Sequence, residues 1–276
     1  MVSIPDVGPR PRLLTSVAMK FLHVLLTAFP LLGTSLGPSA MAGEVRVAVA
    51  TLLAEPLRAI AQSFEKDTGN KVILTVGNTS DLLRQILGGA RYDLLLPNNT
   101  AALKELEARN LVVAGTRYTY ATNSLVLWSP QEGYVDSQGH ILTRNKFDRL
   151  SVVSPDLVYG QPAKQVLDNL GIASKISAKL VERHDIAESR RFVASGAPAL
   201  GIVTLSQVYA NGKLSRGSAW LIPQSLYDPI RQQAVILDEG RNNPTARSFQ
   251  FYLKGSKAGS ILLGYGYRHE VIAGAL

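Results

Sequence analysis

Strand-like and helix-like stretches alternate along most of the chain. In residues 44–50, EVRVAVA, valine recurs at every second position, which predicts a strand. Leu57, Ile60 and Phe64 then recur at helical spacing, and Gly69 is well placed to end that helix. Two further strands, with a helix between them, follow before residue 97. This strand–helix–strand–helix–strand order predicts a mostly parallel sheet covered by helices.

A second unit of the same kind follows, without a linker rich in Pro, Gly and Ser to separate it from the first. We expect the two units to share chain crossings rather than to follow one another as independent domains. The predicted strands after residue 70 are 71–76, 92–96, 123–128, 150–154, 198–205 and 232–237. The predicted helices lie around 82–87, 166–170, 192–194 and 249–253, with a last one ending near Gly264.

Composition supports a folded, non-metallic protein. Of the 276 residues, 46% are hydrophobic and 18% charged, which allows a sizeable core. The absence of cysteine excludes disulfides, thiolate metal sites and a cysteine nucleophile, and the four histidines lack metal-ligand spacing. The net charge of +8 is spread along the chain, with Arg190 and Arg191 as its longest basic run. Nucleic-acid binding is therefore disfavoured.

The beginning of the chain has the pattern of a secretory signal peptide. Basic residues precede an apolar run at 21–37, and small residues flank Met41 in the form that signal peptidase cuts after Ala42. Met19 is an alternative start. We therefore expect residues 1–42 to be removed and the mature protein to be periplasmic.

Motifs for catalysis are poor. The chain has no Walker loop, GxGxxG fingerprint or HExxH motif, and His184 and Asp185 are neighbours in a polar stretch, where a structural role outweighs a catalytic dyad. We therefore expect that this protein is not an enzyme. An exported hydrolase with an unrecognised hydroxyl nucleophile and a basic surface-binding module remain as alternatives.

Small hydroxyl residues occupy two predicted strand-to-helix turns. Thr51 follows the first strand, and Thr79 and Ser80 follow the second. Ligands of open α/β sheets bind at the carboxyl ends of the strands, where helix N-termini favour anions. The alternative is that these hydroxyls cap the helices, since threonine and serine are common there without any ligand.

Several segments in this order resemble the periplasmic molybdate-binding proteins of ABC importers, within the type II periplasmic-binding-protein superfamily. The similarity runs from about Val45 to Tyr267. It is carried by ATLL, FEKDTG, NTSDLLRQILGGARYDLLL, TRYTYATNSLVLWSP, HDI with GAPALGIV, and EGRNNPTARSFQFYLKGSKAGSILLGYGY.

The resemblance implies an α/β fold of two lobes, with mixed sheets flanked by helices and two hinge crossings, near 120–124 and 222–232. Lobe one would comprise 43–121 plus 226–276, and lobe two 122–225. The implied function is non-enzymatic capture of a tetrahedral oxyanion, molybdate or tungstate, between the lobes and its delivery to an ABC permease in the inner membrane. The protein would be a monomer without a cofactor or a metal cation; another anion, such as sulfate, is the alternative.

The resemblance also implies a set of ligand-binding residues. Hydroxyl donors fall on Thr51 and Thr79, and backbone donors fall on Tyr159, with Gly160 as the other register, and on Ile186. At the fifth position this chain has Thr204 where the family has tyrosine. A water or a neighbouring side chain would fill the resulting gap, or the preferred ligand differs.

A second departure is Asp81, where the family has a neutral residue. A carboxylate beside an anion is unfavourable unless it points away or accepts a proton from the ligand. The remaining positions offer donors only, which favours molybdate, tungstate or sulfate over hydrogen phosphate. The sequence does not predict which of molybdate and tungstate binds more tightly.

Overall fold

The computed structural model describes residues 42–196 and 199–269. The predicted signal segment, apart from Ala42, lies outside the described residues. None of the helices within the described ranges has the length and apolar character needed to cross a membrane.

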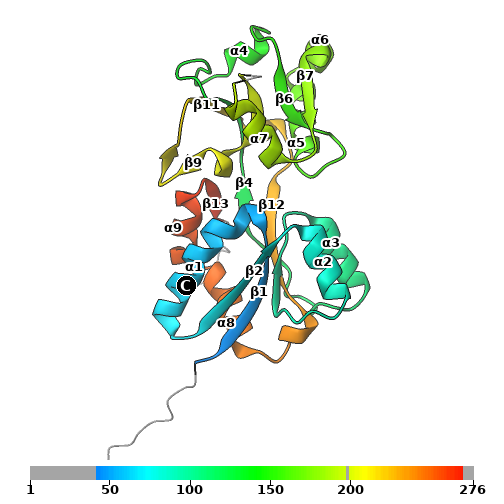
Figure 1. The fold of residues 1–276 in the computed structure, drawn as a ribbon, viewed down its shortest axis with the longest axis vertical. Coiled ribbons are helices and arrows are strands. Elements are labelled where there is room, and N and C mark those ends of the chain that lie inside the picture. The colour runs from blue at the N-terminus through cyan, green and yellow to red at the C-terminus, as the bar shows by residue number, and fades with distance from the viewer. Residues whose placement is uncertain (1–41, 197–198, 270–276) are drawn as a thin grey trace, which may run out of the picture. The chain divides into compact units, whose positions relative to one another are not determined.

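The first lobe is built on a six-stranded mixed sheet (Figure 1). Its strands lie in the order β13–β4–β12–β3–β1–β2, with β1 parallel to β2 and β3, and the other neighbouring pairs antiparallel. The parallel part carries the strand-to-helix turns predicted from the sequence. The strand bounds are β1 Glu44–Ala50, β2 Lys71–Gly77, β3 Leu94–Leu96, β4 Tyr118–Asn123, β12 Ile230–Ile236 and β13 Tyr267–His269.

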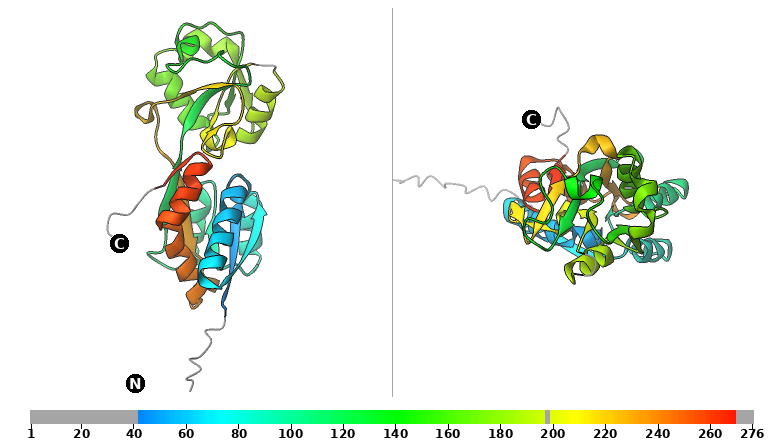
Figure 2. Two further views of the ribbon diagram at one scale, coloured as in Figure 1. Left: turned by 90° about the vertical axis from the view of Figure 1, so that its left-hand side faces the viewer. Right: turned by 90° about the horizontal axis from the view of Figure 1, so that it is seen from above.

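Helices cover both faces of this sheet. Val45, Val47 and Val49 of β1 pack with α1, α8 and α9 on one face, whereas Ala48 packs with α2 and α3 on the other. Figure 1 shows the two groups of helices on opposite sides, and the left view of Figure 2 shows α1, α8 and α9 together. The helix bounds are α1 Ala54–Thr68, α2 Thr79–Leu87, α3 Thr100–Ala108, α8 Pro244–Leu253 and α9 Ser256–Gly264.

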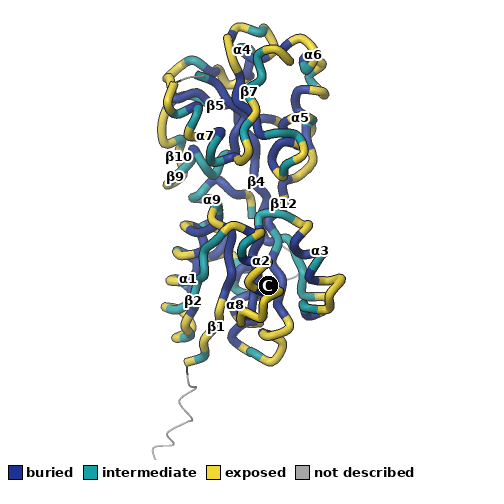
Figure 3. The backbone as a smooth tube through the Cα atoms, turned by 45° about the vertical axis from the view of Figure 1, so that its right-hand side comes forward, coloured by how far each residue is buried: buried dark blue, intermediate teal, exposed yellow. Residues whose placement is uncertain are grey.

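The second lobe has a five-stranded mixed sheet in the order β11–β5–β8–β6–β7 and a separate two-stranded ribbon, β9–β10. Its own core contains Trp128, Phe147 and Val166, and the strands of both lobes are mostly buried while outer helix faces are exposed (Figure 3). The strand bounds are β5 Leu125–Ser129, β6 Leu150–Val153, β7 Leu180–Arg183, β8 Gly201–Thr204, β9 Tyr209–Ala210, β10 Lys213–Leu214 and β11 Ser218–Leu221. The helices are α4 His140–Thr143, α5 Gly160–Asn169, α6 Ala173–Ile176 and α7 Ile186–Ala194.

The chain passes between the two sheets twice. Ser124 alone separates β4 of the first sheet from β5 of the second, and the chain returns between β11 and β12. The 3-10 segments are η1 Thr51–Leu53, η2 Ser177–Lys179, η3 Leu205–Gln207, η4 Gln224–Leu226 and η5 Asp238–Gly240.

The fold class predicted from the sequence is confirmed, as are most of its elements. Gly69 ends α1 with φ of 72°, and its N–H donates to Glu65 O at 2.9 Å, as the spacing predicted. The sequence analysis missed β4, the helices α3, α4 and α6, and the short strands β7, β9, β10, β11 and β13, which are two to four residues long. Hydrophobic periodicity has little to act on in segments of that length.

Candidate functional site

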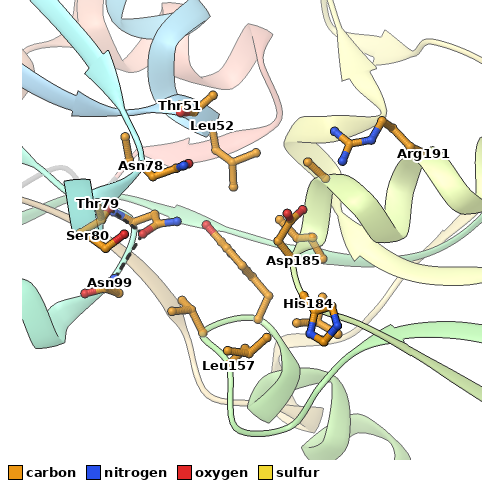
Figure 4. A pocket seen from close by; sticks show the side chains of 17 residues that line it. Thr51, Leu52, Asn78, Thr79, Ser80, Asn99, Leu157, His184, Asp185 and Arg191 are labelled. Carbon is orange, nitrogen blue, oxygen red and sulfur yellow. Dashed lines mark hydrogen bonds between the residues drawn. The ribbon is translucent and has the colours of Figure 1, made fainter. Parts of the chain in front are cut away.

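A pocket of about 480 Å³ contains residues from both lobes. Figure 4 shows Thr51, Asn78 and Thr79 on one side of it and His184 and Asp185 on the other. The lining residues are Ala50, Thr51, Leu52, Asn78, Thr79, Ser80, Asn98, Asn99, Val153, Leu157, Val158, Tyr159, His184, Asp185, Ile186, Ala187 and Arg191.

The beginnings of helical segments converge on this pocket. The first residues of η1, α2 and α7 line it, and so do the residues just before α3 and α5. The first N–H groups of a helix have no partner inside the helix, and the helix dipole places partial positive charge there. In the described part of the chain, the backbone N–H groups of Thr79, Tyr159 and Ile186 have no acceptor. The pocket is therefore suited to an anion.

Thr79 is the first residue of α2 and is only 5% exposed. Its Oγ1 accepts the backbone N–H of Asn98 at 3.1 Å and donates to Asn98 Oδ1 at 2.7 Å. Asn78 is the N-cap residue of α2, and its side chain makes no capping bond. The Thr79 hydroxyl thus links two strand-to-helix turns rather than capping its own helix.

Thr51 is exposed and begins η1. The residue at the N-cap is Ala50, which has no side-chain donor or acceptor. Within the described residues, no hydrogen bond engages the Thr51 hydroxyl, so it is available to a ligand in the pocket. Helix capping explains neither threonine.

Tyr159 is the N-cap residue of α5 and is 5% exposed. Burial raises the pKa of its hydroxyl, and the nearby Gln232 side chain lowers that pKa by less, so the group stays neutral at physiological pH. The next residue, Gly160, is pressed against the end of β6: a Cβ there would lie 1.8 Å from Ser154 O. Glycine is therefore required for the first turn of α5 to approach this close.

Ile186 is buried and begins α7. The preceding Asp185 caps the helix by accepting Glu188 N–H at 2.6 Å, and Glu188 Oε2 in turn accepts His184 N–H at 3.0 Å. The pair differs from a capping box, because Glu188 accepts the N–H of His184, the residue before the N-cap, rather than that of Asp185 itself. His184 and Asp185 are thus organised around a helix start rather than as a dyad.

The structure brings four of the five predicted site residues together. Thr51, Thr79, Tyr159 and Ile186 all line the pocket, whereas Thr204 does not. Thr204 ends β8, is fully buried, and its Oγ1 lies 3.3 Å from Ser206 Oγ, which also accepts Asn123 Nδ2 at 2.8 Å. Thr204 therefore belongs to a polar contact beside the chain crossing.

Asp81 lies outside the pocket lining. Its carboxylate pairs with Arg84 one turn along the exposed face of α2. The carboxylate that would have opposed an anion, or accepted a proton from hydrogen phosphate, is thus directed elsewhere.

The lining residues that the sequence analysis did not single out include Leu52, Asn98, Asn99 and Arg191. The two asparagines had a detectable signal, because they follow the third predicted strand and precede a helix, as Thr51 and Thr79 do after the first two strands. Arg191 had none, because it lies in the second turn of α7 and reaches the pocket only through the way this helix packs. Its guanidinium extends toward the pocket in Figure 4.

The charged groups on the pocket wall are few. Asp185 and Arg191 carry opposite charges, His184 is the one further titratable side chain apart from Tyr159, and lysine is absent from the lining. In the described part of the chain, no cluster of three or more His, Cys, Asp or Glu residues is arranged to hold a metal ion. What the pocket offers is a set of neutral N–H and O–H donors.

Two lobes, two crossings and a pocket of helix N-termini define a periplasmic-type solute-binding protein. The family model for bacterial extracellular solute-binding proteins matches residues 45–268, and the chain belongs to this family.

Among known relatives, the molybdate-binding protein ModA of Azotobacter vinelandii is 47% identical over 83% of this chain and 91% of that protein. ModA of Rhodobacter capsulatus is 34% identical over 84% and 90%, respectively. The solved structure of a periplasmic molybdate-binding protein of Azotobacter vinelandii matches with a TM-score of 0.70 at 34% identity, covering 82% of this chain and 99% of that one. The resemblance found in the sequence is confirmed, and these relatives are binding proteins rather than enzymes.

Proposed function

We propose that this protein captures a tetrahedral oxyanion, molybdate or tungstate, in the pocket and delivers it to an ABC permease of the inner membrane. The convergence of helix N-termini on one pocket carries the proposal. Several charge-assisted hydrogen bonds from preorganised donors can hold a dianion tightly without an ion pair. The 47% identical relative, which is named a molybdate-binding protein, supports this choice of anion.

In this proposal, Thr51 donates through its hydroxyl, Thr79 donates through its hydroxyl when the proton turns from Asn98 Oδ1 to the anion, and Tyr159 and Ile186 donate through backbone N–H groups. Thr204, which lies off the pocket wall, makes no contact with the anion in this proposal. Lobe one comprises 43–121 plus 226–276 and lobe two 122–225, and the two lobes close on the anion. The protein works as a periplasmic monomer after cleavage of a signal peptide behind Ala42.

Isothermal titration calorimetry tests the function. The mature chain, beginning at Gly43, would be titrated with molybdate, tungstate, sulfate, phosphate and thiosulfate in separate runs. We expect sub-micromolar dissociation constants for molybdate and tungstate and at least a hundredfold weaker binding of phosphate, which needs an acceptor for its proton. Tight binding of sulfate alone would change the assigned anion, and no binding of any anion would refute the proposal. N-terminal sequencing of the exported protein tests the cleavage site.

A further inference from the structure

Asn98 stands out among the lining residues because its side chain is held in one orientation. It follows β3 and is partly buried. Its Oδ1 accepts the Thr79 hydroxyl at 2.7 Å and Asn99 Nδ2 at 3.4 Å, while its own backbone N–H donates to Thr79 Oγ1 at 3.1 Å. Two donors on the same oxygen fix which end of the carboxamide faces them.

The nitrogen of this carboxamide, Asn98 Nδ2, faces away from these partners. Across residues 42–196 and 199–269, no protein group accepts a hydrogen bond from Asn98 Nδ2. A carboxamide nitrogen carries two N–H donors and cannot accept. Asn98 belongs to the pocket wall, so these donors are placed where an anion would use them.

Thr79 has a single hydroxyl proton, which decides whether Thr79 or Asn98 can donate a hydrogen bond to the anion. With that proton directed to Asn98 Oδ1, the hydroxyl has no second proton for a ligand. An anion in the pocket then receives a hydrogen bond from Asn98 Nδ2 without first disturbing the Thr79–Asn98 pair. If the anion draws the Thr79 proton to itself, Asn99 still holds the Asn98 oxygen.

We propose that Asn98 Nδ2 is an additional oxyanion donor, oriented by Thr79 and Asn99. The inference rests on the proposed function and names one more residue of the same site. It adds a donor and no acceptor, so it favours a fully ionised dianion over an anion that brings its own proton. The third strand-to-helix turn thereby contributes to binding alongside the turns that carry Thr51 and Thr79.

Asn98→Asp is the sharpest test, because it keeps an oxygen for Thr79 and Asn99 but replaces the N–H donors with a second carboxylate oxygen. We expect the molybdate affinity to fall by roughly a hundredfold or more, since a donor is lost and a like charge is gained. Asn98→Ala removes the donor without adding charge and should weaken binding on the order of tenfold.

Thr100→Asp is the matched control for charge. It places a carboxylate two residues further on, at the first turn of α3 and outside the lining of this pocket. We expect its affinity to stay within about threefold of the parent at 0.15 M salt, where exposed charges are largely screened. Urea unfolding of all three variants without ligand identifies any loss of folding.

Side-chain amide NMR gives a readout that a purely structural role would not change. The Asn98 Nδ2 protons should shift on adding molybdate and exchange more slowly with water. If Asn98→Asp and Asn98→Ala bind within threefold of the parent, and the amide signal does not move, Asn98 is only a link between two loops and the inference is wrong. If the parent binds no oxyanion, the proposed function fails and this role of Asn98 fails with it.

Discussion

Replacing Thr79 by valine tests whether the hydroxyl at the start of α2 takes part in binding. Valine keeps the branched shape of a side chain that is 5% exposed, so packing changes little. One hydrogen bond to a charged group is worth about 1.5–3 kcal/mol, which corresponds to a 10- to 100-fold loss of affinity. The loss comes either from a direct bond or from a misplaced Asn98.

The same substitution has a separate cost in stability. Asn98 N–H donates to Thr79 Oγ1 at 3.1 Å, and valine leaves this donor unpaired. An unsatisfied buried donor costs about 1–3 kcal/mol, and we expect the lower end because Asn98 is only partly buried. Urea unfolding without ligand measures this cost, and calorimetry with molybdate measures the affinity.

Thr79→Ser is the control, because serine keeps the hydroxyl and loses only a methyl group. We expect its affinity to stay within about threefold of the parent. The reasoning is refuted if Thr79→Val binds molybdate as tightly as Thr79→Ser. It is also refuted if Arg84→Gln, which removes an exposed cation paired with Asp81, abolishes binding.

Four further predictions concern two other lining residues, Thr51 and Arg191, and two buried residues outside the lining, Thr204 and Tyr267. Thr51→Val removes a hydroxyl without a protein partner, so calorimetry should show a 10- to 100-fold weaker affinity at unchanged urea stability; equal affinity would show that Thr51 is not a donor. Arg191→Gln removes the cation of the pocket wall and leaves the Asp185 charge uncompensated. For a charge about 10 Å from the dianion, this should slow association in stopped-flow measurements roughly fourfold at low salt and less than about twofold at 0.15 M salt. Arg190→Gln is the control outside the lining, and an equal effect of both substitutions would contradict a role of Arg191 in attracting the anion. Thr204→Val should lower urea stability by about 1 kcal/mol with affinity changed less than threefold, because Thr204 is fully buried and off the pocket wall; a tenfold loss of affinity would place it in the site. Burial raises the pKa of Tyr267 to about 12. The neutral hydroxyl therefore contributes its full stabilisation below the ordinary tyrosine pKa near 10, and this contribution is lost as the pH rises through 12. Tyr267→Phe should make the alkaline loss of urea stability shallower, and an unchanged slope would argue against this contribution of Tyr267.

Periodicity predicted two α/β units, because the core strands and helices are long enough to show a period, and the resemblance to the binding-protein family implied their arrangement as two lobes. The sequence also placed Thr51 and Thr79 correctly at strand-to-helix turns, because hydrophobic strands ending in hydroxyl residues can be recognised locally. The residues contributed by packing could not be found this way. Arg191 reaches the pocket only because α7 packs against β6 and β8, and Thr204 leaves it because the end of β8 is buried against its neighbours. Periodicity carries no information on either contact.

Asn98 is an intermediate case. Its place after the third strand was readable, but its orientation depends on a hydroxyl 19 residues earlier in the chain. A side chain whose direction is set by a long-range hydrogen bond cannot be assigned from local pattern. Asp81 is the opposite case, because its partner Arg84 lies one helical turn along α2, where an acidic–basic pair can be recognised from the local sequence.

The close approach of Gly160 to Ser154 limits how this pocket can be altered. On the α5 side, the position of the donor is set by main chain lying against main chain, and a Cβ at residue 160 would lie 1.8 Å from Ser154 O and 2.7 Å from Val153 O. No choice of side chain can retune that wall without moving the helix. Adaptation to an anion of another size or protonation state must therefore proceed through the side chains facing it, Thr51, Thr79 and Asn98, so that one wall of the pocket is fixed and the other is free to evolve.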